Sequence, residues 1–192
     1  MPVADHDIVE VAITREIALE AKIYAEKALE DPGMRAASIR RGMHGENTID
    51  TKLAWRQGEL AVHAWFFKMG IPCKLPLDPT GGTDEYDLMA KGFRTEVKTK
   101  NFRWWPRVES WYLLVPEDQR SAHIRKGIER YVCACVPKGR GVVLLIGWCG
   151  DAFFREHARL VQPGELLPKW GPMPPPLSWM VPARDLSPMM SF

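Results

Sequence analysis

The sequence predicts an α/β domain in which a central mixed β-sheet is flanked by α-helices. Apolar residues recur at steps of three or four over residues 8–30 and 47–69, as in amphipathic helices, and a short third helix is expected over 151–160. Alternating or wholly apolar runs, which are typical of strands, lie at 85–90, 93–99, 111–115, 131–136 and 142–148. The length of 192 residues, with 46% hydrophobic and 26% charged residues, suits one domain or at most two small ones.

Three segments are expected along the chain. Residues 1–45 form an N-terminal helical extension, residues 46–162 form the core, and residues 163–192 form a proline-rich tail that packs on the core and lies extended over its surface. The helix over 8–30 is expected to begin at a cap provided by Asp5 or Asp7 and to end at Asp31. The helix over 47–69, which can divide at Gly58, is expected to bury the stripe Leu60, Ala64 and Phe67.

Charge and cysteine content exclude some classes of protein. The net charge of +2 does not by itself indicate a polyanionic partner, so nucleic-acid binding has to be argued from local patches. The four cysteines include no C-x-x-C pair, so we interpret them as free thiols in a reducing compartment rather than ligands of an iron–sulfur cluster. The longest apolar run, Val142–Ile146, is too short to span a membrane, and no signal peptide opens the chain. We therefore expect a cytoplasmic protein without a membrane partner.

Residues 85–98 predict a tight β-hairpin with Lys91 and Gly92 as its two loop residues. In that register Ala90 pairs with Phe93, and Asp87 lies opposite Glu96. Because side chains alternate along a strand, one face is the core face and carries Tyr86, Leu88, Ala90, Phe93, Thr95 and Val97. The other face carries nearly all of the charge, on Glu85, Asp87, Arg94, Glu96, Lys98 and Lys100, together with Met89.

This pairing predicts a divalent-metal site on the hairpin. Directly opposed residues have Cβ atoms about 4.5–5.5 Å apart, where two carboxylates repel unless a cation lies between them. Mg²⁺ binds oxygen ligands and keeps several waters, so one Mg²⁺ or Mn²⁺ ion can bridge Asp87 and Glu96 and still bind a phosphate oxygen and a nucleophilic water. Lys98, on the same face, can orient that water or stabilise the transition state. The alternative is a solvent-facing hairpin with mixed charges.

The order Asp87, then Glu96-Val97-Lys98, resembles the D-x(n)-E-x-K signature of the PD-(D/E)XK, or restriction-endonuclease-like, nuclease superfamily. Members have a helix before the hairpin, often with a Gly-Glu pair, and Gly58-Glu59 is similar to it. The resemblance covers residues 55–100 by motif, and it departs where many members have proline, at Tyr86. It implies a restriction-endonuclease-like core, catalysis by Lys98, and metal ligation by Asp87, Glu96, the Val97 carbonyl and Glu59.

A basic and aromatic stretch follows the hairpin. Basic side chains can meet phosphates and exposed aromatic rings can stack on unpaired bases, so we expect a nucleic acid to contact Lys100, Arg103, Trp104 and Arg107. The alternative is a tryptophan pair packed in the core beside solvated arginines. A second basic patch, over residues 35–41, is interpreted as a solvated helix face.

Together these features predict a Mg²⁺- or Mn²⁺-dependent deoxyribonuclease, similar in size to small phage or bacterial nucleases with this fold. DNA is the expected partner, RNA is left open, and so is a homodimer or a partner subunit. A non-catalytic nucleic-acid-binding or accessory subunit that retains the fold is the first alternative. A structural metal-binding domain is the second.

Overall fold

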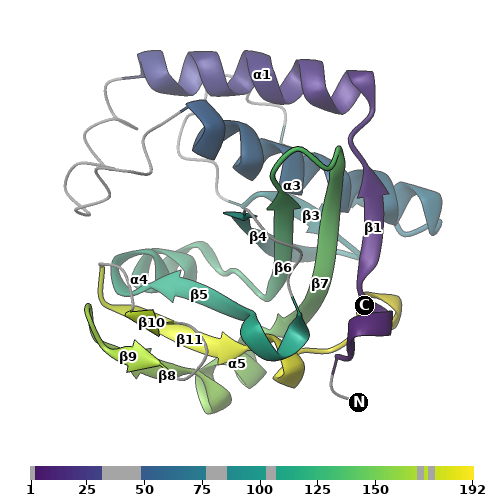
Figure 1. Ribbon diagram of the computed structural model, residues 1–192. Helices are drawn as coiled ribbons and strands as arrows, with labels where there is room; N and C mark the ends of the chain where they lie inside the picture. Colours follow the sequence, from purple (N-terminus) through teal and green to yellow (C-terminus); the bar gives the residue numbers. More distant parts are fainter. Residues whose placement is uncertain (1–2, 32–48, 77–85, 103–106, 168–170, 173–175) are drawn as a thin grey trace.

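The computed structural model describes residues 3–31, 49–76, 86–102, 107–167, 171–172 and 176–192 of the chain (Figure 1). Within these ranges the fold is mixed α/β, with a curled mixed sheet flanked by helices. The α-helices are α1 (Arg15–Glu30), α3 (Ile49–Lys68), α4 (Glu117–Lys126) and α5 (Asp151–His157). Short 3-10 helices lie at Asp5–Asp7, Val108–Ser110, Ala183–Asp185 and Met189–Ser191.

The main sheet has six strands in the spatial order β1-β7-β6-β4-β3-β2. Only β4 and β6 run parallel, and every other neighbouring pair is antiparallel. The connection from β4 to β6 passes through β5 (Tyr112–Pro116) and α4. The strands of the sheet are β1 (Val9–Ala12), β2 (Cys73–Lys74), β3 (Leu88–Ala90), β4 (Phe93–Phe102), β6 (Arg130–Pro137) and β7 (Val142–Gly150).

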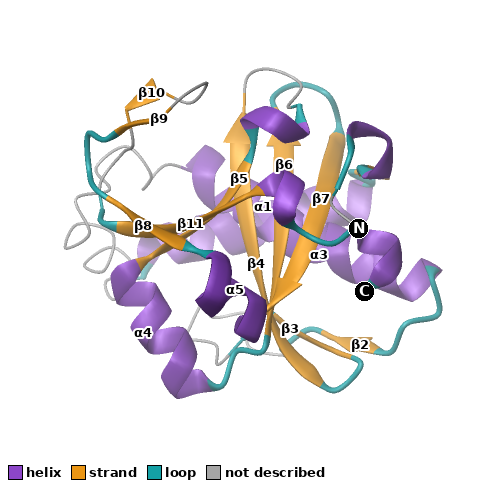
Figure 2. Ribbon diagram, turned by 90° about the horizontal axis from the view of Figure 1, so that it is seen from below, coloured by secondary structure: helices purple, strands orange, loops and turns teal. Residues whose placement is uncertain are grey.

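Two hydrophobic layers cover the two faces of the sheet. Along β6, Val132, Ala134 and Val136 face α3, which lies against the sheet with α1 outside it (Figure 1). The alternate residues Tyr131, Cys133 and Cys135 face a second layer. Figure 2 shows that layer in front of the main sheet, where α4 and α5 accompany a smaller sheet ordered β5-β11-β8. Its other strands are β8 (Arg159–Val161) and β11 (Ser178–Pro182), and a separate pair joins β9 (Leu166–Leu167) to β10 (Gly171–Pro172).

The predicted hairpin register is confirmed within the β3–β4 ladder. Ala90 pairs with Phe93 and Leu88 with Thr95, and the two loop residues Lys91 and Gly92 have φ angles of 50° and 83°. This left-handed turn suits the twist of the strands. The ladder ends at Leu88, so the expected direct pairing of Asp87 with Glu96 is not part of it.

Tyr86 also departs from the predicted face. Leu88, Ala90, Thr95 and Val97 are buried on the α3 side, as expected of the core face. Tyr86 instead packs with the opposite layer, where the guanidinium of Arg94 lies 5.8 Å from the centre of its ring. The chain turns before Leu88, so strand alternation does not extend to this residue.

The N-terminal helix is shorter than predicted. Residues 9–12 form β1, whose Val9 and Val11 pack on the α3 side of the sheet, and the helix begins only at Arg15. Its cap is therefore Thr14, whose hydroxyl accepts a hydrogen bond from the Ile17 amide at 3.3 Å, and not Asp5 or Asp7. In β1 the apolar residues Val9 and Val11 alternate with more exposed residues. This period of two is hard to recognise in the sequence, because residues 8–30 taken together also fit the spacing of an amphipathic helix.

The second helix is continuous, and its buried side agrees with the predicted stripe at Leu60 but not at Phe67. Phe67 is 80% exposed, whereas Trp65 and Phe66 are buried. Gly58 does not divide α3. A Cβ atom at this position would overlap the Thr99 side chain, so the missing side chain lets α3 lie close against β4.

The last fifteen residues are part of the core and not an extended surface tail. Strand β11 pairs with both β5 and β8, and Val181, Met189 and Phe192 are buried. No helix in the described ranges combines the length and apolar character needed to cross a membrane. The boundaries at residues 45 and 162 stay a prediction.

Candidate functional site

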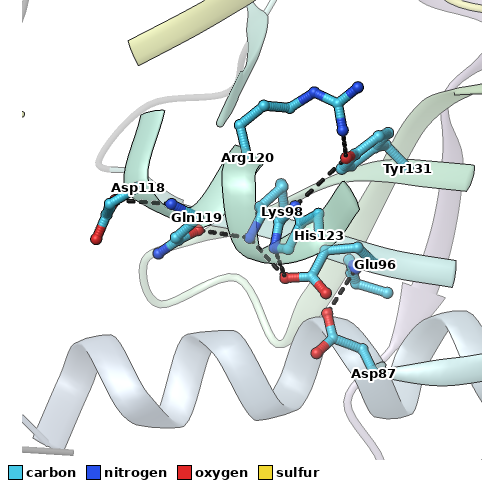
Figure 3. A network of polar contacts seen from close by, with 9 residues as sticks. Asp87, Glu96, Lys98, Asp118, Gln119, Arg120, His123 and Tyr131 are labelled. Carbon is cyan, nitrogen blue, oxygen red and sulfur yellow. Dashed lines mark hydrogen bonds and ion pairs between the residues drawn. The ribbon is translucent and has the colours of Figure 1, made fainter. Parts of the chain in front are cut away.

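The three residues of the predicted motif lie together at the end of the hairpin away from its turn, where β3 begins beside β4. Asp87 precedes β3 and turns its carboxylate back over β4, where Oδ2 accepts a hydrogen bond from the Val97 amide at 2.6 Å. Glu96 and Lys98 point to the face opposite α3, and the Lys98 ammonium donates to Oε1 of Glu96 at 2.6 Å (Figure 3). Their side chains are 15% and 18% exposed, so this ion pair is largely withdrawn from water.

Helix α4 adds two side chains that were not predicted. Gln119 and His123 are four residues apart and so share one face of the helix. The Gln119 carbonyl oxygen accepts from the Lys98 ammonium at 2.8 Å, and Nε2 of His123 lies 3.2 Å from Oε1 of Glu96. The helix ends at Gly127, whose φ of 65° gives a left-handed cap.

A buried polar chain continues behind His123 (Figure 3). Nδ1 of His123 lies 3.4 Å from the Tyr131 hydroxyl, which accepts a hydrogen bond from Nη1 of Arg120 at 3.1 Å. The other end of the Arg120 guanidinium forms an ion pair with Asp151 at 2.7 Å. Register explains the position of Tyr131, since it lies directly beside Glu96 in the parallel β4–β6 pair.

The two carboxyl groups of the hairpin have opposite electrostatic environments. Removal from solvent, together with the negative charges of Glu96 and Glu59, raises the pKa of Asp87 well above its ordinary value. Desolvation would also raise the pKa of Glu96, but the Lys98 ammonium and the His123 ring outweigh it and lower that pKa. Burial lowers the pKa of His123, although the neighbouring carboxylate of Glu96 acts in the opposite direction.

Glu59 reaches the site from α3. Its Oε2 accepts from Nη1 of Arg56 at 2.8 Å, while Nη2 of the same arginine contacts Glu20 of α1 at 2.7 Å. The charge of Glu59 nevertheless contributes to the raised pKa of Asp87. Of the predicted ligand residues, Asp87, Glu96 and Val97 adjoin one another, and the charge of Glu59 on the neighbouring helix acts on Asp87.

The donor set fits a hard divalent cation. The negative charges of Glu96 and Glu59 raise the cost of ionising Asp87, which a bound cation would relieve. Within the described ranges, no three His, Cys, Asp or Glu side chains converge as they do around a bound ion. Magnesium needs only one or two protein carboxylates, since waters and substrate phosphates complete its shell. Asp87 and Glu96, with the Val97 carbonyl, meet that requirement.

The predicted nucleic-acid residues are only partly described. Arg103 and Trp104 lie outside the described residues, and Arg107 is exposed. Lys100 is part of β4, and its ammonium lies 3.2 Å from the centre of the Tyr112 ring and 5.7 Å from that of Trp111. This is a cation–π contact with aromatic residues of the small-sheet side.

Sequence reasoning missed the α4 contribution for an identifiable reason. The spacing of Gln119 and His123 indicates a shared helix face, but only the parallel pairing of β4 with β6 brings α4 over Glu96 and Lys98. A scan of protein-family models and searches of curated proteins and solved structures found no match to the chain.

Proposed function

We propose that this chain is a Mg²⁺- or Mn²⁺-dependent nuclease of the PD-(D/E)XK type that hydrolyses phosphodiester bonds in DNA. The observation that supports it best is the juxtaposition on one hairpin edge of two electrostatically coupled carboxylates, Asp87 and Glu96, with Lys98 hydrogen-bonded to the second. A helix bearing Glu59 precedes the hairpin and a mixed sheet contains it, which is consistent with a restriction-endonuclease-like core.

The proposed roles follow from the side-chain chemistry. Asp87, Glu96 and the Val97 carbonyl would hold the metal, and Glu59 adds negative charge near Asp87. The bound ion would supply a water of lowered pKa and neutralise charge on the phosphate. Lys98 carries three N–H donors, and Glu96 and Gln119 take two of them in this structure, so one remains to orient the water or contact the phosphate.

The test uses the purified protein with Mg²⁺ or Mn²⁺ and duplex, single-stranded, flapped and branched DNA, with RNA in parallel. We expect cleavage of DNA, and a loss of at least about a hundredfold in rate for Asp87→Asn and for Lys98→Ala. Asp185→Asn and Lys22→Ala, at exposed positions outside the motif and the residues that contact it, are the matched controls and keep full activity. Wild-type protein that cuts none of these substrates refutes the enzymatic proposal.

A non-catalytic nucleic-acid-binding subunit that retains the fold is the second candidate. The ion pair between Lys98 and Glu96 favours it, because it neutralises one carboxylate without a cation. This candidate predicts DNA binding by the wild-type protein with no cleavage in either metal, and unchanged DNA affinity in Asp87→Asn. The nuclease proposal predicts that Mn²⁺ binds the wild-type protein and that Asp87→Asn weakens this binding.

A further inference from the structure

We infer that His123 is a positioning residue for Glu96, and that Tyr131 and Arg120 fix its tautomer so that Nε2–H always donates to Oε1 of Glu96. This inference rests on the proposed function and deepens it, because it names the residues that aim a metal carboxylate. None of the three residues belongs to the D…E-x-K motif. They come from α4 and from the start of β6.

The direction of the hydrogen bonds follows from which groups can accept. An arginine guanidinium can only donate, so in the contact of 3.1 Å between Nη1 of Arg120 and the Tyr131 hydroxyl the oxygen accepts. The hydroxyl keeps its own hydrogen to donate, and Nδ1 of His123, at 3.4 Å, is within reach as the acceptor. A neutral imidazole that accepts at Nδ1 carries its proton on Nε2, the atom that lies 3.2 Å from Glu96.

The far end of this polar chain lies in the core. Arg120 is 5% exposed and forms an ion pair with Asp151, at the first turn of α5. Its guanidinium also lies 5.4 Å from the centre of the Phe154 ring. The Tyr131 ring is fully buried, and burial raises the pKa of its phenol, which therefore keeps its proton. The orientation of His123 is thus set from the core and not from solvent.

The contact with His123 gives the two carboxylate oxygens of Glu96 different roles. His123 and Lys98 both approach Oε1, and the second oxygen is drawn on the side of Asp87 (Figure 3). Fixing Oε1 in this way leaves Oε2 presented to a cation shared with Asp87. Groups that hydrogen-bond a metal ligand in this manner typically change metal affinity or activity by about 10–100-fold when removed.

The first experiment determines the tautomer of His123 by ¹⁵N NMR of the whole protein, with the His123 signals assigned from their loss in His123→Gln. We expect the Nε2–H tautomer in the wild type and a smaller share of it in Tyr131→Phe, which keeps the ring but loses the hydroxyl and leaves only the Glu96 carboxylate to favour Nε2–H. Ser178→Ala removes another buried hydroxyl, one that donates to the Pro176 carbonyl at 2.8 Å, and is the control for a general loss of stability. It leaves the His123 signals unchanged.

The second experiment measures Mn²⁺ binding by calorimetry, with cleavage rates in parallel. We expect Tyr131→Phe to weaken Mn²⁺ binding about tenfold, and His123→Ala by 10–100-fold. His123→Gln restores most of the affinity, because its amide nitrogen reaches the position of Nε2 and always donates. In the His123→Gln background, Tyr131→Phe has no further effect, since there is no tautomer left to fix.

Each result has a distinct meaning. Active wild-type protein with the Nδ1–H tautomer, or Tyr131→Phe with unchanged tautomer and Mn²⁺ affinity, overturns this inference and leaves the nuclease proposal standing. A further loss of Mn²⁺ affinity from Tyr131→Phe in the His123→Gln background also overturns it. The hydroxyl would then affect metal binding by stabilising the fold and not through the tautomer of His123. Wild-type protein that neither binds Mn²⁺ nor cuts DNA refutes the proposed function, and the positioning role with it.

Discussion

Replacing Gly58 by alanine tests how closely α3 must lie against β4. A Cβ at this position would overlap Oγ1 of Thr99 and come within 2.9 Å of both its Cβ and its Cγ2. Overpacking of this kind typically costs about 1–3 kcal/mol. Replacing a glycine by alanine in a helix interior stabilises the protein by about 0.5–1 kcal/mol, which offsets part of this cost. We therefore expect Gly58→Ala to lower the free energy of unfolding by about 1–2 kcal/mol, and Tm by about 2–8 °C for a chain of this length.

The assay is thermal and urea unfolding of Gly58→Ala, Thr99→Ala and the double variant. Thr99→Ala removes two of the three overlapping atoms, and its hydroxyl is buried without a hydrogen-bond partner in the described structure. We expect the double variant to lose clearly less stability than the sum of the two single changes. Two results would refute this reasoning. One is a Gly58→Ala protein with unchanged or raised Tm, and the other is a double variant whose loss of stability equals the sum of the two single losses.

Three further predictions concern the turn, a thiol and the half-buried cation Arg130. Gly92→Ala forces a side chain into φ 83°, and we expect the urea midpoint to report a loss of about 1–2 kcal/mol; no loss would mean that this turn tolerates a Cβ. Burial raises the pKa of Cys73 to about 11, so its thiolate fraction at pH 8 is on the order of 10⁻³. Alkylation should be slow and should accelerate about tenfold per pH unit, and fast modification of the folded protein at pH 8 would contradict this. Arg130 lies 3.8–4.9 Å from three aromatic ring centres, so Arg130→Lys should lower stability by about 1 kcal/mol, and equal stability would show that stacking of the planar guanidinium adds nothing.

The hairpin could be predicted because its determinants are local. Lys91-Gly92 can adopt the left-handed turn, and the alternation on either side then fixes which side chains share a face. The strands over 131–136 and 142–148 were also predictable, because residues buried on both faces form continuous apolar runs. The charged pair Glu96 and Lys98 followed from the same alternation.

The remaining parts depend on contacts between distant segments. Residues 9–12 form a strand because they pair with β7. The residues next to Val9 in the sequence do not indicate this pairing, because its partner lies far along the chain. His123 likewise gains its place beside Glu96 through α4 and β6, so its role is invisible to local spacing. The buried C-terminal strand ends at Pro182 and follows a run of prolines at 174–176, which gave this segment the composition of a surface tail.

The pairing of β1 with β7 also bears on how the chain folds as it is made. Val9 pairs with Leu145, so the first strand has no partner until most of the chain has been synthesised. At about 5–20 residues per second, that interval is on the order of ten seconds. Throughout it, Val9 and Val11 belong to an unpaired strand, beside a helix whose buried face also lacks its partner α3 until later in synthesis. The nascent protein is therefore expected to engage chaperones early and to complete its main sheet only as a late, slow step.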